Sequence, residues 1–169
     1  MKNVYNEKNI KRVCFNMIKI ENNILINVMD RDIILGTIKI PSTVNIISRA
    51  SLAYCESLKE IILPNSVTSI DDGAFFKCIL LKKIIIPNSA IFIRDDVFHG
   101  CELLEEIKLP ETMSYIGSGV FWNCKFLKSI TLPNNLNLNR HWFNKFTNPQ
   151  CVIHHRGKKY KVEDVLLYY

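Results

Sequence analysis

Cysteine and histidine are the residues of this 169-residue chain whose chemistry could be catalytic or metal-binding, and the chain has 6 Cys and 4 His. Four of the cysteines follow one another at intervals of 23 residues, at Cys55, Cys78, Cys101 and Cys124. A structural zinc site needs four ligands that converge on one point. Equal spacing instead places one thiol on each of four stacked units, about 4.8 Å apart. The spacing therefore favours a column of small buried thiols over a metal site.

Side chains that point in parallel from stacked units also have poor geometry for a disulfide bond. Cys14 and Cys151 lie outside the 23-residue register. We expect both to be reduced, which fits an intracellular compartment.

The histidines do not form a catalytic set with these thiols. His99 lies two residues before Cys101, but a nucleophilic Cys–His pair needs an activated thiolate in a cleft, and a cysteine in a buried column is the opposite. His154 and His155 are neighbours on a predicted strand, so their side chains should point to opposite faces. A metal site or a catalytic site built on these histidines is not expected.

Two acidic pairs recur in successive repeats, Asp71-Asp72 and Asp95-Asp96. We expect them to cap short helical turns, and a calcium site is the weaker alternative. The chain has no glycine-rich phosphate loop. We therefore predict that the protein is not an enzyme, with no catalytic residues, no metal, no cofactor and no small-molecule substrate.

The cysteine spacing is one column of a longer pattern. Five of the six prolines have the same interval, at Pro41, Pro64, Pro87, Pro110 and Pro133. The repeated unit reads Leu-x-x-Ile-x-Leu-Pro-x-x-Val-x-x-Ile-x-x-x-x-Phe-x-x-Cys. A unit of this length cannot close a core alone, so stacked units must share one. Its Leu-x-x-Ile-x-Leu segment predicts a short parallel strand that ends at the proline. The rest should return through a short extended piece and a helical or 3₁₀ turn.

The unit at 58–78, LKEIILPNSVTSIDDGAFFKC, closely resembles the BspA-type leucine-rich repeat, and the resemblance covers about residues 35–155. It implies a right-handed leucine-rich repeat solenoid of the α/β horseshoe class, rich in strands, with the Leu-x-x-Ile-x-Leu strands on the concave face. It also implies a role in binding proteins or cell surfaces, because many family members are secreted or attached to the surface.

The polar start of the chain leads into no apolar segment typical of a secretory signal, and no apolar run approaches the ~18 residues of a membrane helix. We therefore expect a cytoplasmic location without membrane insertion, although members of the resembled family are often found outside the cell.

We predict one leucine-rich repeat domain over 1–169, with an N-terminal cap (1–34), about five repeats (35–149) and a C-terminal strand, hairpin and cap (150–169). Both ends need caps, because terminal units expose core and unpaired strand edges. The N-terminal cap should hold a hairpin within 17–28. At the other end, 151–155 should form the sixth stacked parallel strand. The chain should then turn at Arg156-Gly157, return antiparallel over 158–162, and end in a short helix. The next cysteine position is Thr147.

Outward positions of the predicted strands form two columns on the concave face. The predicted binding residues there are Lys39, Glu60, Ile62, Lys83, Ile85, Glu106 and Lys108. The acidic and basic members that alternate on neighbouring strands suit a structural ladder. Ile62 and Ile85 place adjacent apolar side chains on an exposed face, either as ordinary strand residues or as a partner contact.

A second candidate edge carries aromatic residues, which are enriched at interface cores. Its members are Phe92, Tyr115 and Trp122. The equally weighted alternative is that these side chains fold over the coil and cover core.

The formal net charge of +6 lies mainly at the ends of the chain. Residues 125–169 contain eight Lys or Arg against two acids, whereas 21–124 contain nine against thirteen. The densest basic group, at 156–161, could attract nucleic acid or another polyanion, but it coincides with the predicted edge strand, where lysines block sheet pairing. We predict a non-enzymatic scaffold that binds another protein through its concave face. The alternatives are a cell-surface adhesin-type module and, less favoured, a polyanion binder.

Overall fold

The larger of two sheets contains the Leu-x-x-Ile-x-Leu segments. The computed structural model describes residues 18–29 and 33–168. This sheet has seven strands in the order β13-β12-β11-β9-β7-β5-β3. Six are parallel, at Thr37–Lys39 (β3), Glu60–Ile62 (β5), Lys83–Ile85 (β7), Glu106–Lys108 (β9), Ser129–Thr131 (β11) and Val152–His155 (β12). The six stacked parallel strands predicted from the 23-residue repeat are confirmed.

The second sheet lies on the returning side of each coil and has the order β1-β2-β4-β6-β8-β10. Its strands are Lys19–Glu21 (β1), Ile24–Asn27 (β2), Ile46–Ile47 (β4), Ser69–Ile70 (β6), Phe92–Ile93 (β8) and Tyr115–Ile116 (β10). The predicted N-terminal hairpin is present as β1 and β2, which pair antiparallel. Since β2 pairs with β4, the hairpin extends this second sheet.

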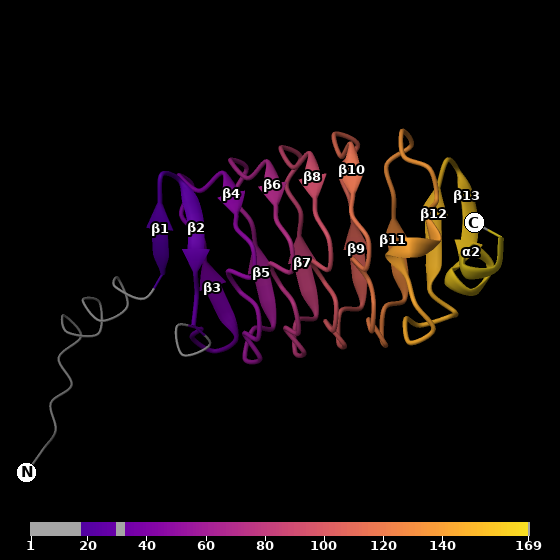
Figure 1. Cartoon of the computed structure of the whole chain (residues 1–169), viewed down its shortest axis with the longest axis horizontal. Helices are drawn as coiled ribbons and strands as arrows, with labels where there is room; N and C mark the ends of the chain where they lie inside the picture. The colour runs from indigo at the N-terminus through magenta and orange to yellow at the C-terminus, as the bar shows by residue number, and fades with distance from the viewer. Residues whose placement is uncertain (1–17, 30–32, 169) are drawn as a thin grey trace, which may run out of the picture.

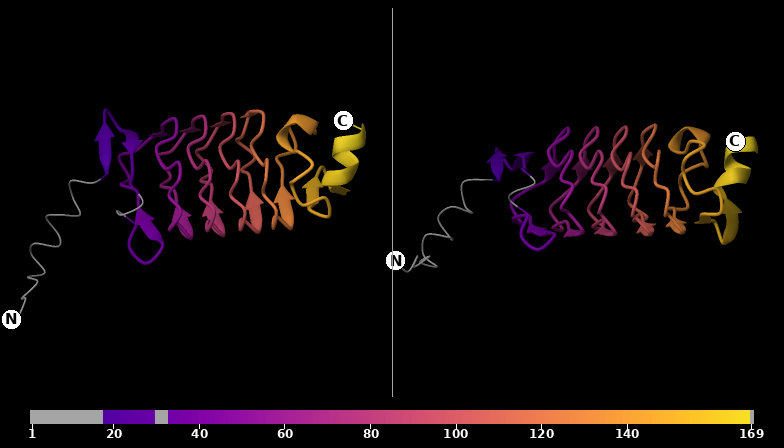
Figure 2. Two further views of the ribbon diagram at one scale, coloured as in Figure 1. Left: turned by 60° about the horizontal axis from the view of Figure 1, so that its bottom comes forward. Right: turned by 90° about the horizontal axis from the view of Figure 1, so that it is seen from below.

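The coils stack in a nearly straight row from the hairpin to the C-terminal helix (Figures 1 and 2). Strong horseshoe curvature arises when helices about 10 Å wide stack opposite strands that are only about 4.8 Å apart. Here strands line both sides, so the spacing is matched and the stack has little curvature. We call the outward surface of β3, β5, β7, β9, β11 and β12 the strand face.

The turns after the second sheet contain the i→i−3 bonds of the predicted 3₁₀ turns, but only as isolated turns and not as a helix. Their backbone N–H groups alternate between two kinds of partner. Ala74 and Phe76 donate to carbonyls three residues back, whereas Phe75 donates to Val97 O in the next coil, at 3.1 Å. Because every second N–H bonds across coils, no continuous 3₁₀ helix forms. In the described part of the chain, the one 3₁₀ helix is Arg140–Trp142 (η2), in the last coil.

The acidic pairs also have a different role from the predicted helix caps. The side-chain oxygen of Asp72 accepts the backbone N–H of Asp95 at 3.2 Å, and that of Asp95 accepts the N–H of Ser118 at 2.8 Å. Each carboxylate therefore joins one coil to the next at the equivalent position.

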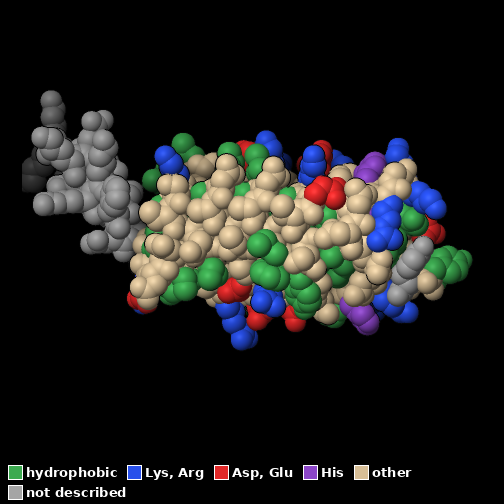
Figure 3. Space-filling view, turned by 90° about the horizontal axis from the view of Figure 1, so that it is seen from above, with side chains coloured by type: hydrophobic (Ala, Val, Ile, Leu, Met, Phe, Trp, Pro, Cys, Tyr) green, Lys and Arg blue, Asp and Glu red, His purple; other side chains and the backbone are tan. Residues whose placement is uncertain are grey.

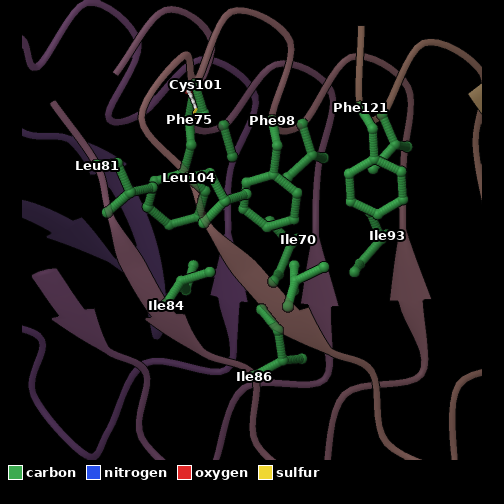
Figure 4. Close-up of a cluster of buried hydrophobic side chains, with 14 of the residues drawn as sticks. Ile70, Phe75, Leu81, Ile84, Ile86, Ile93, Phe98, Cys101, Leu104 and Phe121 are labelled. Carbon is green, nitrogen blue, oxygen red and sulfur yellow. Dashed lines mark hydrogen bonds between the residues drawn. The ribbon is translucent and has the colours of Figure 1, made fainter. Parts of the chain in front are cut away.

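The core is a row of stacked phenylalanines inside the coils. The ring centroids of Phe75 and Phe98 are 5.7 Å apart, those of Phe98 and Phe121 are 6.2 Å apart, and Phe143 continues the row at 5.7 Å. Figure 4 shows the first three rings side by side, with Ile70 and Ile93 close to them. All four phenylalanines are buried.

The C-terminal end follows the prediction closely. The chain turns at Arg156-Gly157, and Lys158–Lys161 (β13) pairs antiparallel with β12. The helix Val162–Tyr168 (α2) follows and buries Val162 and Val165. Cys14, most of the basic segment 1–20 and Tyr169 lie outside the described residues.

Candidate binding surfaces

The repeated cysteines form the predicted buried column. Cys55, Cys78, Cys101 and Cys124 are all buried, and so is Cys151. Each column thiol donates to the backbone carbonyl 26 residues earlier, or 27 for Cys55, at 3.1–3.6 Å. Burial raises the pKa of Cys101 well above its usual value and that of Cys151 to about 12. These thiols therefore remain protonated at neutral pH, which removes the nucleophilic thiolate.

Thr147 continues this column in the last coil. Its hydroxyl is buried and donates to Phe121 O at 2.8 Å, again 26 residues earlier. The thiols and the hydroxyl therefore have the same structural role, which is a hydrogen bond between coils.

The side chains of the neighbouring histidines, His154 and His155, point to opposite faces, as the sequence predicted. His155 is buried and His154 is half-buried, which is the expected alternation of faces along β12. His99 is half-buried: Nδ1 lies 3.1 Å from Asp96 Oδ1 and Nε2 lies 3.2 Å from Asn123 Nδ2. Within the described residues, no group of three or more His, Cys, Asp or Glu side chains could hold a metal ion.

The structure places all seven predicted concave-face residues on the strand face. Register pairs Thr37 with Glu60 and Lys39 with Ile62, and β7 and β9 continue both columns. Ile62 is 59% exposed and Ile85 is 43% exposed, on adjacent strands. Lys83 Nζ lies 3.3 Å from Glu60 Oε1, so part of the predicted charge ladder is an ion pair.

Two shallow hollows lie along the strand face. The first is lined by residues of β3 and β5, among them Lys39, Glu60 and Ile62. The second spans β7, β9 and β11, with Lys83, Glu106 and Lys108 in its lining. Six of the seven predicted residues therefore line one of these two hollows, and Ile85 lines neither.

The second candidate edge divides into two groups. Phe92 and Tyr115 are adjacent on β8 and β10, and the Arg94 guanidinium lies over both rings, 5.3 and 5.5 Å from their centroids. Sequence reasoning missed Arg94, although its position two residues after Phe92 is a signal for the same face of an extended segment.

Trp122 belongs to a different column on the turn side. Its ring contacts His99, which in turn contacts Phe76, with ring centroids 5.8 and 4.9 Å apart. Tyr54 continues the row beyond Phe76. These rings pack edge to face along the stack, while Tyr54 and Trp122 remain partly exposed.

Basic side chains gather at the C-terminal end of the face seen in Figure 3. Lys158, Lys159 and Lys161 are exposed on β13, which is an outer strand of the seven-stranded sheet. This is the placement expected for edge protection. Polyanion binding at these lysines stays a prediction.

Stacked coils, strand columns and inter-coil ladders define the chain as a leucine-rich repeat solenoid. The particular family is the BspA-type leucine-rich repeat region: its model matches six copies over residues 22–149, and the chain belongs to this family. None of the curated proteins matches the chain.

Solved structures with the same fold include a bacterial cell-surface protein. A leucine-rich cell surface protein from Faecalibacterium prausnitzii is 28% identical with a TM-score of 0.71, over 80% of this chain and 35% of that chain. The pneumococcal vaccine antigen PcpA is 26% identical with a TM-score of 0.75, over 83% of this chain and 35% of that chain. A leucine-rich repeat protein of T. pallidum, at 24% identity and a TM-score of 0.63 over 80% and 74% of the two chains, shares the fold.

The chain thus spans about a third of the length of the first and the second of these proteins, 35% of each. The F. prausnitzii relative is described as a cell-surface protein, so this comparison gives no support to the expected cytoplasmic location. Among the helices of the described residues, none has the length and apolar character needed to span a bilayer.

Proposed function

We propose that this chain is a non-enzymatic scaffold that binds another protein through its strand face. The observation that carries the proposal is the pair of exposed isoleucines, Ile62 and Ile85, on the adjacent strands β5 and β7 of the face. An apolar pair flanked by charged residues resembles the apolar centre and polar rim of a protein interface.

The strand face is also suited to binding because it is preformed. Ile61, Ile84 and Ile107 lie buried beneath it, and each of β5, β7 and β9 is paired on both sides. A partner would therefore bind with little ordering of the backbone, which reduces the entropic cost of association.

A second candidate function is an adhesin-type module at a cell surface. The support for it is the family and the F. prausnitzii relative that is described as a cell-surface protein. Antibody labelling of intact cells that make the native protein separates this location from the cytoplasmic one.

Replacing Ile62 and Ile85 together by Asp tests the strand face. We expect the double variant to lose the proteins that the full chain captures, since two charges would replace the apolar centre. The matched control is Tyr115→Asp, an exposed aromatic of the second sheet. Quantitative mass spectrometry of captured proteins is the measurement. If Tyr115→Asp abolished capture while the isoleucine variant did not, the strand face would be the wrong surface.

A further inference from the structure

One of the two columns of the strand face contains a symmetric pattern that the proposed function does not explain. We call it the Lys–Ile–Ile–Lys row. Lys39, Ile62, Ile85 and Lys108 are outward residues of four adjacent strands, at equivalent positions. Both lysines are exposed, and neither forms an ion pair within residues 18–29 and 33–168. An apolar pair is thus enclosed by two free positive charges.

The charges beside this row are partly neutralised. Glu60 forms an ion pair with Lys83, with 3.3 Å between Oε1 and Nζ. Glu105, at the edge of β9, forms an ion pair with Lys128, with 2.6 Å between Oε2 and Nζ. Glu106 is the exposed acid nearest in sequence to Lys108 on the same face. It would weaken attraction of an anion to Lys108, so Lys39 should contribute more. The hollow beside Lys39 also provides the larger recess.

The spacing of the row selects a shape of partner. Neighbouring strands are about 4.8 Å apart, so three steps place the two lysine positions about 14 Å apart. In an extended chain, side chains on one side recur every second residue, and residues i and i+4 are about 13.5 Å apart. A segment lying along the solenoid axis therefore places i and i+4 at the lysines and i+2 between the isoleucines.

Resting on the proposed function, we infer that the strand face binds an extended peptide segment of a partner protein with the pattern acidic-x-apolar-x-acidic. The middle side chain contacts Ile62 and Ile85, and the flanking carboxylates pair with Lys39 and Lys108. Charge complementarity sets the register of the segment, and the apolar contact distinguishes it from a simple polyanion.

The test uses the full chain and a fluorescent synthetic peptide centred on Glu-Thr-Leu-Thr-Glu, with binding followed by anisotropy. We expect saturable binding that weakens with added salt. K39E/K108E should weaken it by about tenfold, because two attractions become two repulsions. The same variant should gain affinity for the peptide centred on Lys-Thr-Leu-Thr-Lys. K158E/K159E, with the same charge change on β13, is the matched control and should leave binding unchanged.

Three results would overturn this inference. The first is no binding by the unaltered chain, and the second is equal binding by K39E/K108E. The third is unchanged affinity when the central Leu of the peptide becomes Ser, together with full displacement by heparin; the face would then recognise charge alone, as a polyanion site does. Capture of the native partner that is lost in the isoleucine variant but kept in K39E/K108E would remove this inference and leave the proposed function standing.

Discussion

Thr147 shows how one position in each coil contributes to the stack. Its hydroxyl donates to Phe121 O in the preceding coil, as the thiols of Cys78, Cys101 and Cys124 do at equivalent positions. The shared chemistry is a small side chain with one donor, directed at a buried carbonyl. A nucleophile is not required at any of these positions.

This equivalence predicts a matched pair of substitutions. Thr147→Val keeps the shape of the side chain but removes the donor, and should lower the free energy of unfolding by about 1 kcal/mol. Thr147→Cys restores the residue of the other coils and should cost less. Urea unfolding of both variants is the measurement. A Cys variant less stable than the Val variant would contradict the shared role.

His155 predicts a pH dependence at the C-terminal end. The side chain is 4% exposed, and its Nδ1 has no hydrogen-bond partner. Burial lowers its pKa and the Arg156 charge lowers it further, while a hydrogen bond with the Pro133 backbone and the Glu111 charge partly oppose this. Its cross-strand neighbour on β13 is Lys158, which is exposed.

The folded chain therefore binds the His155 proton less readily than the unfolded chain, so stability is lost as the pH falls through the unfolded pKa of about 6.5. We expect the urea midpoint to decrease between pH 7.5 and pH 5.5, and His155→Gln to reduce that decrease. His141→Gln, at an exposed histidine, is the control. An identical decrease in the His155→Gln protein would assign the effect elsewhere.

At the scale of the element, β13 ends the larger sheet with a row of lysines. An outer strand presents unpaired backbone groups that can join another molecule. K158V/K159V should therefore promote self-association, measured by sedimentation velocity, whereas K158R/K159R keeps the charge and should stay like the original protein. Equal sedimentation of the valine and arginine variants would show that these lysines do not protect the edge.

The strands and hairpins were predictable because they depend on local alternation and on the 23-residue register. The hydrogen bonds between the turns were not, because whether the Phe75 N–H bonds locally or to Val97 depends on a coil that lies beside it in space. Phe143 likewise fills the core position one residue before the periodic position Asn144, since the last coil is one residue shorter there. The alternation of inward and outward residues along the strands identified the strand-face columns. The contacts of Arg94 with Phe92 and Tyr115 could be identified only from the positions of the side chains.

At the scale of the whole molecule, shape follows from the matched spacing of two strand-bearing sides. Because the coils stack in a nearly straight row (Figure 1), the side-chain columns of the strand face run along the solenoid axis without strong bending. Such a surface differs from a deep cavity because specificity depends on which side chains follow one another along the axis. The Lys39–Ile62–Ile85–Lys108 row is one such order.

Backbone bonds and side-chain ladders between coils join equivalent positions, as Asp72 to Asp95 and Asp95 to Ser118 do. A whole coil could thus be duplicated in the gene without breaking the pattern on either side of it. Each duplication within the Lys–Ile–Ile–Lys row would move its two charges apart by about 4.8 Å. The length of peptide that such a face accepts would then change in fixed increments. Evolution or design could therefore adjust that length by adding or removing one coil at a time.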